Sequence, residues 1–145
     1  MANDSVPNAL YKNHRNGTFS EIGLPAGVAL SGEGRPQSGR GLDIADYNND
    51  GLFDIFVTHF SNDSNTLYRT NGAGFFTDET FAAGLSAPSL QHLGWGTSFV
   101  DLDNDVQLDI FVANGHIHPG IDNFGNGATY FQPKELYRNL GDGRF

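Results

Sequence analysis

The sequence predicts an all-β protein made of propeller-type blades, each with four antiparallel strands, and its 145 residues hold about two and a half of them. Two observations carry this prediction: a hairpin-like segment that occurs three times, and an acidic loop that occurs twice between strand-like runs. The runs are short and rich in β-branched and aromatic residues, which favours strands over helices. A four-stranded unit that recurs at roughly 50 to 70 residues is typical of a propeller blade.

Each hairpin-like segment opens with Leu-Tyr and a basic residue, turns at a glycine and reaches a phenylalanine nine residues after the leucine. The turns contain Asn-Gly, Ala-Gly and Asp-Gly, and both Asn-Gly and Asp-Gly are strong short-range signals for a β-hairpin. We therefore expect two antiparallel strands joined by a tight turn in each segment. The segments are Leu10–Phe19, Leu67–Phe76 and Leu136–Phe145.

The first acidic loop, residues 46–54, has the ligand spacing of a calcium site. Side-chain oxygens occur at its positions 1, 3, 5 and 9, and a glycine at position 6 permits a sharp turn. Ca²⁺ is a hard cation that takes about six to eight oxygens, commonly from alternate residues of one loop and the backbone carbonyl at position 7. A polar surface turn is the alternative, because Asp, Asn and Gly also dominate turns. The expected ligands are Asp46, Asn48, Asp50, the carbonyl of Leu52, and Asp54.

A second loop, residues 101–109, repeats the pattern, which makes coincidence a poor explanation. Both loops lead into the same run, Asp-Ile-Phe-Val. Position 6 is Val106 here, and a β-branched residue with positive φ is strained by roughly 1–2 kcal/mol. An EF-hand is disfavoured, because its twelfth position needs a bidentate Glu and both loops have a valine there. We expect a second Ca²⁺ site, formed by Asp101, Asp103, Asp105, Gln107 and Asp109.

The order of these features divides a single repeat region, residues 1–145, into partial and complete blades. We expect residues 1–22 to form the outer hairpin of one blade, residues 40–80 a complete blade, and residues 94–145 a second blade whose last strand is cut short. The calcium loops fall between the first and second strands of their blades. Residues 113–135 form an insertion, and an excursion of that length is usually functional, an interface or disordered. Because the chain stops inside a repeated motif, we expect a piece of a longer protein or a subunit completed by its neighbours.

Composition argues against several classes of function. There are 17 acidic and 8 basic residues, so the chain lacks the excess of Lys and Arg that binds nucleic-acid phosphates. It has no cysteine, and therefore neither disulfides nor thiol chemistry. No apolar run approaches the ~20 residues that span a bilayer, and no signal peptide is visible. The paired carboxylates lie inside the calcium loops and no catalytic triad stands out, so we expect no enzymatic activity.

A few other residues are candidates for ligand binding or modification. His116 and His118 lie in a Gly/Pro-rich stretch, and their imidazoles suit Zn or Cu, but no third ligand is evident. Three asparagines match the N-glycosylation motif, which also arises by chance in loops rich in Asn and Ser. They are Asn3, Asn16 and Asn62.

The whole pattern resembles the FG-GAP/VCBS repeats of integrin α-subunit propellers and of many secreted bacterial proteins. Within that group it is most similar to the cartilage-acidic-protein-like (ASPIC/UnbV-associated) proteins. The resemblance rests on the two loops with their Asp-Ile-Phe-Val exits, the Leu-Tyr-basic hairpins, and the segments Ala2–Asn8, Gly94–Thr97 and Ala113–His116. It implies part of a seven-bladed ring, calcium held by the loop residues, and a role in adhesion or scaffolding. Val106 departs from the family pattern, which has glycine at that position.

These features predict a calcium-binding, non-catalytic extracellular module for structure or adhesion. Loops of this kind at extracellular affinities fill near millimolar Ca²⁺ and stay largely empty in a cytosol. Exposed sheet edges invite pairing with other chains, so we expect assembly into a ring or filament with second copies, or with other chains that complete the partial blades. A glycan or a cell-surface molecule is a further expected ligand. The alternative is part of a larger secreted propeller that binds glycans or belongs to a polysaccharide-acting enzyme.

Overall fold

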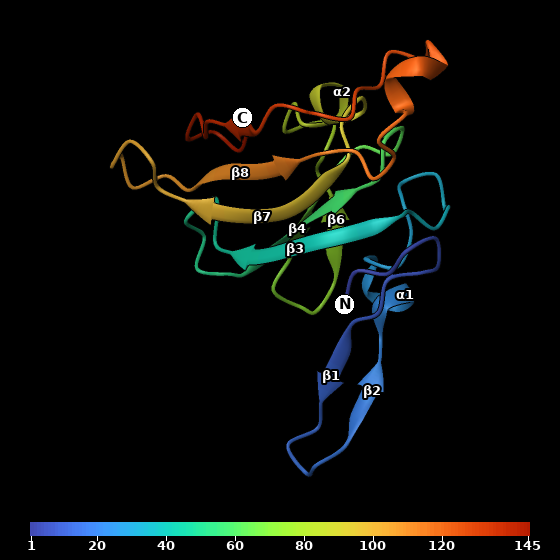
Figure 1. The fold of residues 1–145 in the computed structure, drawn as a ribbon. Coiled ribbons are helices and arrows are strands. Elements are labelled where there is room, and N and C mark those ends of the chain that lie inside the picture. Colours follow the sequence, from blue (N-terminus) through green and yellow to red (C-terminus); the bar gives the residue numbers. More distant parts are fainter.

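The computed structural model describes all residues 1–145, and its nine strands form three antiparallel sheets that follow one another along the chain (Figure 1). The N-terminal hairpin consists of β1 (Tyr11–Asn13) and β2 (Phe19–Glu21). The middle sheet consists of β3 (Gly39–Ala45), β4 (Asp54–His59), β5 (Thr66–Thr70) and β6 (Phe76–Asp78), in that order. The C-terminal sheet consists of β7 (Gly94–Val100), β8 (Asp109–Asn114) and β9 (Glu135–Tyr137). The prediction of an all-β protein is confirmed.

The connections contain three single-turn helices. α1 (Gly23–Ala26) follows the N-terminal hairpin, α2 (Ser86–Ser89) lies between the middle and C-terminal sheets, and η1 (Ile121–Phe124) is a 3-10 turn between β8 and β9. None of these helices is long or apolar enough to cross a membrane.

The three Leu-Tyr-basic segments turn in the same way. Each turn has two left-handed residues, and the second of them is the glycine that the sequence marks as the turn residue. The turns are longer than the two-residue loop typical of Asn-Gly hairpins, because each closes with a bond between residues four apart. These bonds run from the N–H to the carbonyl group: His14 to Thr18, Asn71 to Phe75, and Leu140 to Arg144, at 3.0, 3.0 and 2.8 Å.

The register of the middle sheet sorts its side chains onto two faces, because successive residues of a strand point to opposite sides. We name these the first and second faces of the sheet. The first face carries Leu42, Ile44, Ile55, Val57 and Tyr68. The second face carries Asp43, Phe56 and Leu67.

The C-terminal sheet has the same arrangement, and its residues match those of the middle sheet one by one. The register irregularity of the first strand also recurs, between Gly39 and Leu42 in β3 and between Gly94 and Thr97 in β7. The first face carries Thr97, Phe99, Ile110, Val112 and Tyr137. The second face carries Ser98, Phe111 and Leu136.

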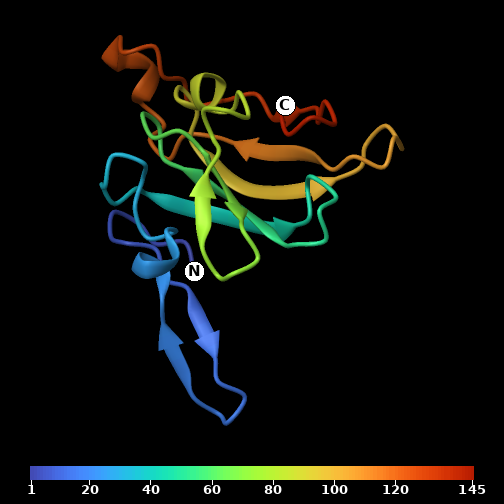
Figure 2. The ribbon, with the colours of Figure 1, turned by 180° about the vertical axis from the view of Figure 1, so that it is seen from behind.

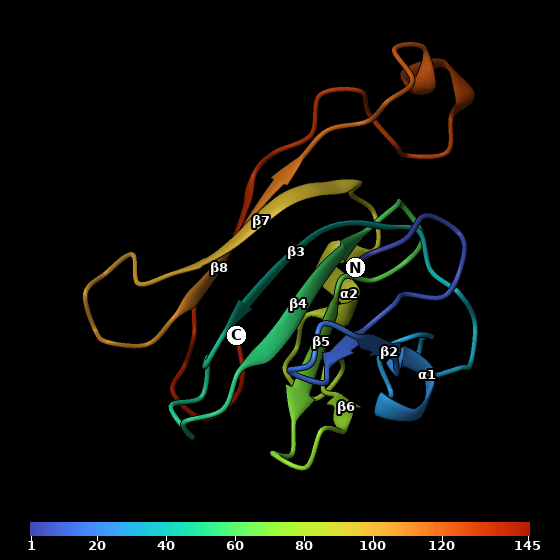
Figure 3. The same ribbon diagram turned by 90° about the horizontal axis from the view of Figure 1, so that it is seen from below.

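The main core lies where the second face of the middle sheet packs against the first face of the C-terminal sheet, with β3 beside β7 (Figure 3). Phe56 and Leu67 are fully buried there, against Ile110 and Val112. The rings of Phe56 and Phe99 meet edge to face, with 6.2 Å between their centroids. Face-to-face packing of two sheets through such side chains is the arrangement that the hydrophobic effect favours.

A smaller core lies on the first face of the middle sheet. Val57 and Tyr68 are buried there together with Val28, and Leu10 packs against them from the start of the N-terminal hairpin. The hairpin itself projects away from the two larger sheets, and all six residues of its strands are exposed (Figure 2). The hairpin therefore contacts the rest of the chain mainly through the residues that flank it.

Candidate metal centres

Both acidic loops occupy the same place in their sheets, between the first and second strands, and both lie at the same end of the molecule (Figure 1). The first loop joins β3 to β4, and the second joins β7 to β8. Positions 4 and 6 are left-handed in each: φ is 58° at Asn49, 84° at Gly51, 61° at Asn104 and 70° at Val106. The second loop thus adopts the conformation of the first although it has valine in place of glycine.

Backbone N–H groups hold the side-chain oxygens of the first loop. Asp46 accepts from Asp50 N through Oδ1 (3.0 Å) and from Gly51 N through Oδ2 (2.8 Å). Asp50 Oδ1 accepts from Leu52 N at 3.0 Å, and Asn48 Oδ1 also accepts from Asp50 N at 3.1 Å. The loop is therefore built around its first and fifth residues.

The second loop repeats three of these four bonds at equivalent residues. Asp101 accepts from Asp105 N (3.1 Å) and from Val106 N (3.0 Å), and Asp105 Oδ1 accepts from Gln107 N (2.9 Å). Here the carboxylates of Asp101, Asp103 and Asp105 also gather, with one oxygen of each within 4.8 Å of the others. Three such oxygens suit a hard divalent cation.

Asp54, at position 9 of the first loop, links the loop to the third strand. Its side chain is fully buried, and Oδ1 accepts from Thr70 N at 2.8 Å, where β5 ends. Oδ2 is buried without a hydrogen-bond partner. Burial raises the pKa of Asp54 to about 6, and the negative charges of Asp50 and Asp46 add to this shift. A buried carboxylate oxygen that lacks a partner fits a cation, although the carboxylates of Asp46, Asp50 and Asp54 do not gather at ligand spacing as those of Asp101, Asp103 and Asp105 do.

Asp109 takes the same part in the second loop but has partners for both oxygens. Oδ1 accepts from Asn139 N at 2.9 Å, just beyond β9, and Oδ2 accepts from Leu102 N at 3.3 Å. The side chain of Gln107 points to the neighbouring loop instead, where its Oε1 accepts from Asn49 Nδ2 at 3.2 Å. The backbone carbonyl of Gln107 is therefore the group that remains for its own loop, at the position of Leu52 in the first loop.

Two arginines that sequence reasoning missed reach the loops from the Leu-Tyr-basic segments. Arg69 Nη2 lies 3.3 Å from Asp50 Oδ2. Arg138 Nη2 lies 2.7 Å from Asp103 Oδ2 and 3.5 Å from an oxygen of Asp105. The basic residue that follows Leu-Tyr in these segments is the sequence signal that could have identified them. It places one positive charge beside the carboxylates of each loop.

The histidine candidates do not form a comparable cluster. His116 Nδ1 accepts from His118 N at 3.1 Å, and the two rings pack against different aromatic partners, Phe60 and Phe124, each at 5.7 Å between centroids. Asp101, Asp103 and Asp105 of the second loop form the only group of three or more acidic, His or Cys side chains with ligand spacing. The structure brings no third ligand to the histidines.

The three glycosylation candidates lie in turns or loops. Asn3 Nδ2 donates to the carbonyl of Pro7 at 2.7 Å, and Asn16 Oδ1 accepts from Thr18 N at 3.0 Å. Asn62 has a left-handed backbone with φ of 73°. Their modification remains a prediction.

Comparison of the sequence with known proteins places this chain among repeat proteins. The family model for the FG-GAP-like repeat matches residues 1–57 and 46–112. Cartilage acidic protein 1 is 35% identical to the chain over 115 residues in Homo sapiens, 31% over 113 residues in Mus musculus and 31% over 115 residues in Xenopus tropicalis. Each alignment covers 77% of this chain and 16% of the relative, so the chain spans about a sixth of the length of the curated relatives it matches.

Proposed function

Because the chain belongs to the FG-GAP-like repeat family, we propose that it is a non-catalytic module of the adhesion type whose two acidic loops each bind one Ca²⁺. In this proposal the sheets are blades of a β-propeller, and calcium fixes the inner hairpin of each blade. Asp46, Asn48, Asp50, Leu52 and Asp54 would hold the first ion. Asp101, Asp103, Asp105, Gln107 and Asp109 would hold the second.

The buried, unpartnered Oδ2 of Asp54 is the observation that carries this proposal. An isolated carboxylate oxygen in an apolar setting costs free energy, and proteins normally pair such charges or place them on a metal. Thr70 N satisfies the other oxygen of Asp54. A bound cation would satisfy Oδ2 and would also relieve the repulsion between this carboxylate and those of Asp46 and Asp50.

The chain's own residues transmit this effect to the fold. The first loop joins β3 to β4, and Asp54 accepts from the end of β5, so one ion would tie three strands together. The second loop has the same links through Asp109 and Asn139. Calcium would supply charge neutralisation and oxygen coordination, and its binding energy would add to the free energy of unfolding.

The proposed setting is extracellular, where loops of this kind fill near millimolar Ca²⁺. The partners in this proposal are other copies of the chain, or other chains that cover its incomplete sheets. The relatives are named as cartilage acidic proteins, which accords with an extracellular scaffold but identifies no ligand of this chain.

Glycan binding is a second candidate, and an aromatic hollow beside the β8–β9 connection favours it. Trp95, Tyr130 and Phe131 line this hollow together with the amide side chains of Asn114 and Gln132. The rings of Trp95 and Phe131 are exposed, and such rings can stack on the apolar face of a sugar. Glycan-array binding that Phe131→Ala abolishes would support this role.

Thermal unfolding in EDTA and in about 2 mM Ca²⁺ tests the calcium proposal. With a Kd of about 0.1 mM, each site would add about 1.8 kcal/mol. Two sites should then raise the melting temperature by about 7–14 °C. The same Tm in Ca²⁺ and EDTA would contradict the proposal. Mg²⁺ at equal concentration is the control for ionic strength.

A further inference from the structure

Asn139 lies between the two acidic loops and donates hydrogen bonds to both. The residue is only 3% exposed. Its side-chain Nδ2 donates to the carbonyl of Tyr47 in the first loop at 2.9 Å and to the carbonyl of Leu108 in the second loop at 3.1 Å. Because a buried N–H that loses its partner costs free energy, this amide holds the two loops in a fixed relation to each other.

The two carbonyl groups belong to the parts of the loops that carry the expected ligands. Tyr47 lies between the first and third residues of its loop, and both of these are expected ligands. Leu108 directly precedes Asp109, the ninth residue of the second loop, and Asp109 Oδ1 accepts from the backbone N of Asn139 at 2.9 Å. A change in the position of either set of ligands therefore reaches the other loop through one residue.

Two further contacts join the loops. The ring of Tyr47 is buried in the main core and stacks on Phe99, shortly before the second loop begins, with 6.5 Å between their centroids. At the surface, Asn49 Nδ2 donates to Gln107 Oε1 at 3.2 Å. An exposed bond of this kind competes with water and contributes less than a buried one, so the amide of Asn139 is the stronger polar link.

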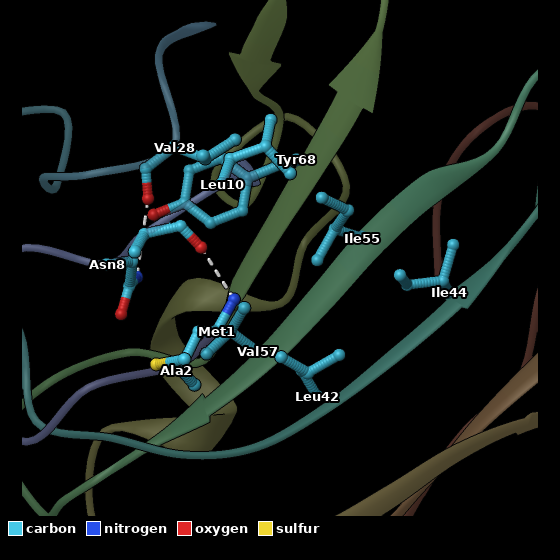
Figure 4. Close-up of a pocket in the computed structure, with 11 residues that line it drawn as sticks. Met1, Ala2, Asn8, Leu10, Val28, Leu42, Ile44, Ile55, Val57 and Tyr68 are labelled. Carbon is cyan, nitrogen blue, oxygen red and sulfur yellow. Dashed lines mark hydrogen bonds between the residues drawn. The ribbon is translucent and has the colours of Figure 1, made fainter. Parts of the chain in front are cut away.

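The other side of the first loop offers no such link. Ile44 and Ile55 flank the loop in β3 and β4, and Figure 4 shows them at an apolar hollow on the first face of the middle sheet. The hydrogen bonds in this hollow join residues 1–28 to one another, and none of them reaches the loop. The contacts between the loops therefore lie on the side of the main core, where Tyr47 and Asn139 are.

The middle sheet has a threonine in the place of Asn139, which shows what the amide adds. Thr70 follows Leu-Tyr-Arg as Asn139 does, and its N–H also donates to the ninth residue of its loop, Asp54, at 2.8 Å. Thr70 Oγ1 accepts from the N–H two residues later at 3.3 Å, and Asn139 Oδ1 does the same at 2.9 Å. The two residues share these bonds and differ in the two that Asn139 Nδ2 donates. The amide is therefore not needed to hold the ninth residue of a loop.

We propose that Asn139 is a positioning residue that couples the two loops, so that Ca²⁺ binding in one raises the affinity of the other. This inference rests on the calcium role proposed above and adds that binding is positively cooperative. The first binding event orders the shared contacts, so the second has less ordering left to complete and is more favourable. Electrostatics alone would act in the opposite direction, because filling one acidic loop weakens the attraction of the other for a cation. Positive cooperativity is therefore the signature of the structural link.

Isothermal calorimetry with Ca²⁺ on single-loop variants measures the coupling. Asp101→Ala disables the second loop and Asp46→Ala the first, so each variant reports the affinity of one loop alone. At about 0.15 M salt the charges are screened beyond ~8 Å. The product of the two stepwise association constants of the unsubstituted chain should exceed the product of the two single-loop constants by about fivefold or more.

Asn139→Thr tests whether this excess depends on the amide. The variant takes the residue of the middle sheet and retains the bonds that both residues make, so two ions should still bind but the excess should vanish. In EDTA the same variant should speed hydrogen exchange at Gly51 N, which donates to Asp46, because the first loop loses a donor from the other sheet. Asn13→Thr is the matched control. Asn13 has the equivalent, exposed position in the N-terminal hairpin, and its substitution should change neither measurement.

The outcomes separate this inference from the calcium proposal. Two bound ions with no excess, or with a deficit, would overturn the coupling and leave the calcium sites in place. An excess that persists in Asn139→Thr would overturn the role of Asn139, and Asn139→Ser, which also keeps a hydroxyl acceptor, replaces the threonine variant if that variant does not fold. A chain that binds no Ca²⁺ would reject the calcium proposal and this inference together.

Discussion

Exchanging the residues at position 6 of the two loops should change stability in opposite directions. Val106 has φ of 70° and its side chain is 74% exposed. Gly51 has φ of 84°, and nothing lies within 4 Å of the position that a Cβ would take there. Neither change therefore alters packing, and the backbone conformation alone decides the result. Val106→Gly should stabilise the chain, and Gly51→Val should destabilise it.

The size of the effect follows from two opposing quantities. A β-branched residue in the left-handed region costs about 1–2 kcal/mol. Glycine makes the unfolded chain more flexible, which costs about 0.4–1 kcal/mol. The net change is about 0.5–1 kcal/mol in each direction, or about 1–4 °C in Tm.

Thermal melting in EDTA measures this change without a contribution from metal, and the double variant should match the unsubstituted chain. A lower Tm for Val106→Gly, or a higher one for Gly51→Val, would refute the left-handed conformation at these positions.

Three further predictions concern buried charge, the loop arginines and close backbone contact. Burial lowers the pKa of His59 to about 4, so the unfolded chain binds a proton more readily. The contribution of His59 to stability should be full above pH 6.5 and fall by about 2 kcal/mol at pH 5, against an opposite effect of Asp54, whose raised pKa of about 6 favours the folded chain as the pH falls. His59→Gln should remove this loss in urea titrations at pH 7 and pH 5, and an unchanged loss would exclude His59 as its source. Arg138→Gln should raise calcium affinity roughly two- to fivefold in calorimetry, because it removes a cation that competes for Asp103. Arg144→Gln, which lies outside the loops, is the control. Weaker calcium binding by Arg138→Gln would mean that Arg138 positions the ligands. Gly41→Ala should lower the Tm, because its Cβ would overlap the carbonyl oxygen of Trp95. Gly96→Ala, where nothing lies within 4 Å of the Cβ position, should leave the Tm unchanged, and equal effects in melting of the two variants would contradict the assigned contacts.

The local features of this fold could be predicted from the sequence because local chemistry determines them. The strands follow from short apolar runs, and the hairpins from glycine turns. The loop conformation follows from the spacing of Asp and Asn, and the hydrogen bonds accepted by the first and fifth residues are the same in both loops. Even the left-handed backbone of Val106 was expected from its position in the repeat.

Contacts between distant segments could not be predicted in this way. Tyr47 lies in an acidic loop whose other apolar residues, Leu52 and Phe53, are exposed, yet Tyr47 is buried in the main core, where its ring stacks on Phe99 at 6.5 Å. Arg138 meets Asp103 only because β9 pairs with β8. Which face of each sheet is buried also depends on which sheet packs against which, and the alternation of side chains along a strand does not specify that.

Calcium titration by isothermal calorimetry tests the central claim most directly. We predict two Ca²⁺ ions per chain, one remaining in Asp46→Ala and one in Asp101→Ala, with little binding left when both residues are changed. A chain that is folded in EDTA and binds no Ca²⁺ at millimolar concentration would contradict the account, because its loops would then be ordinary polar turns.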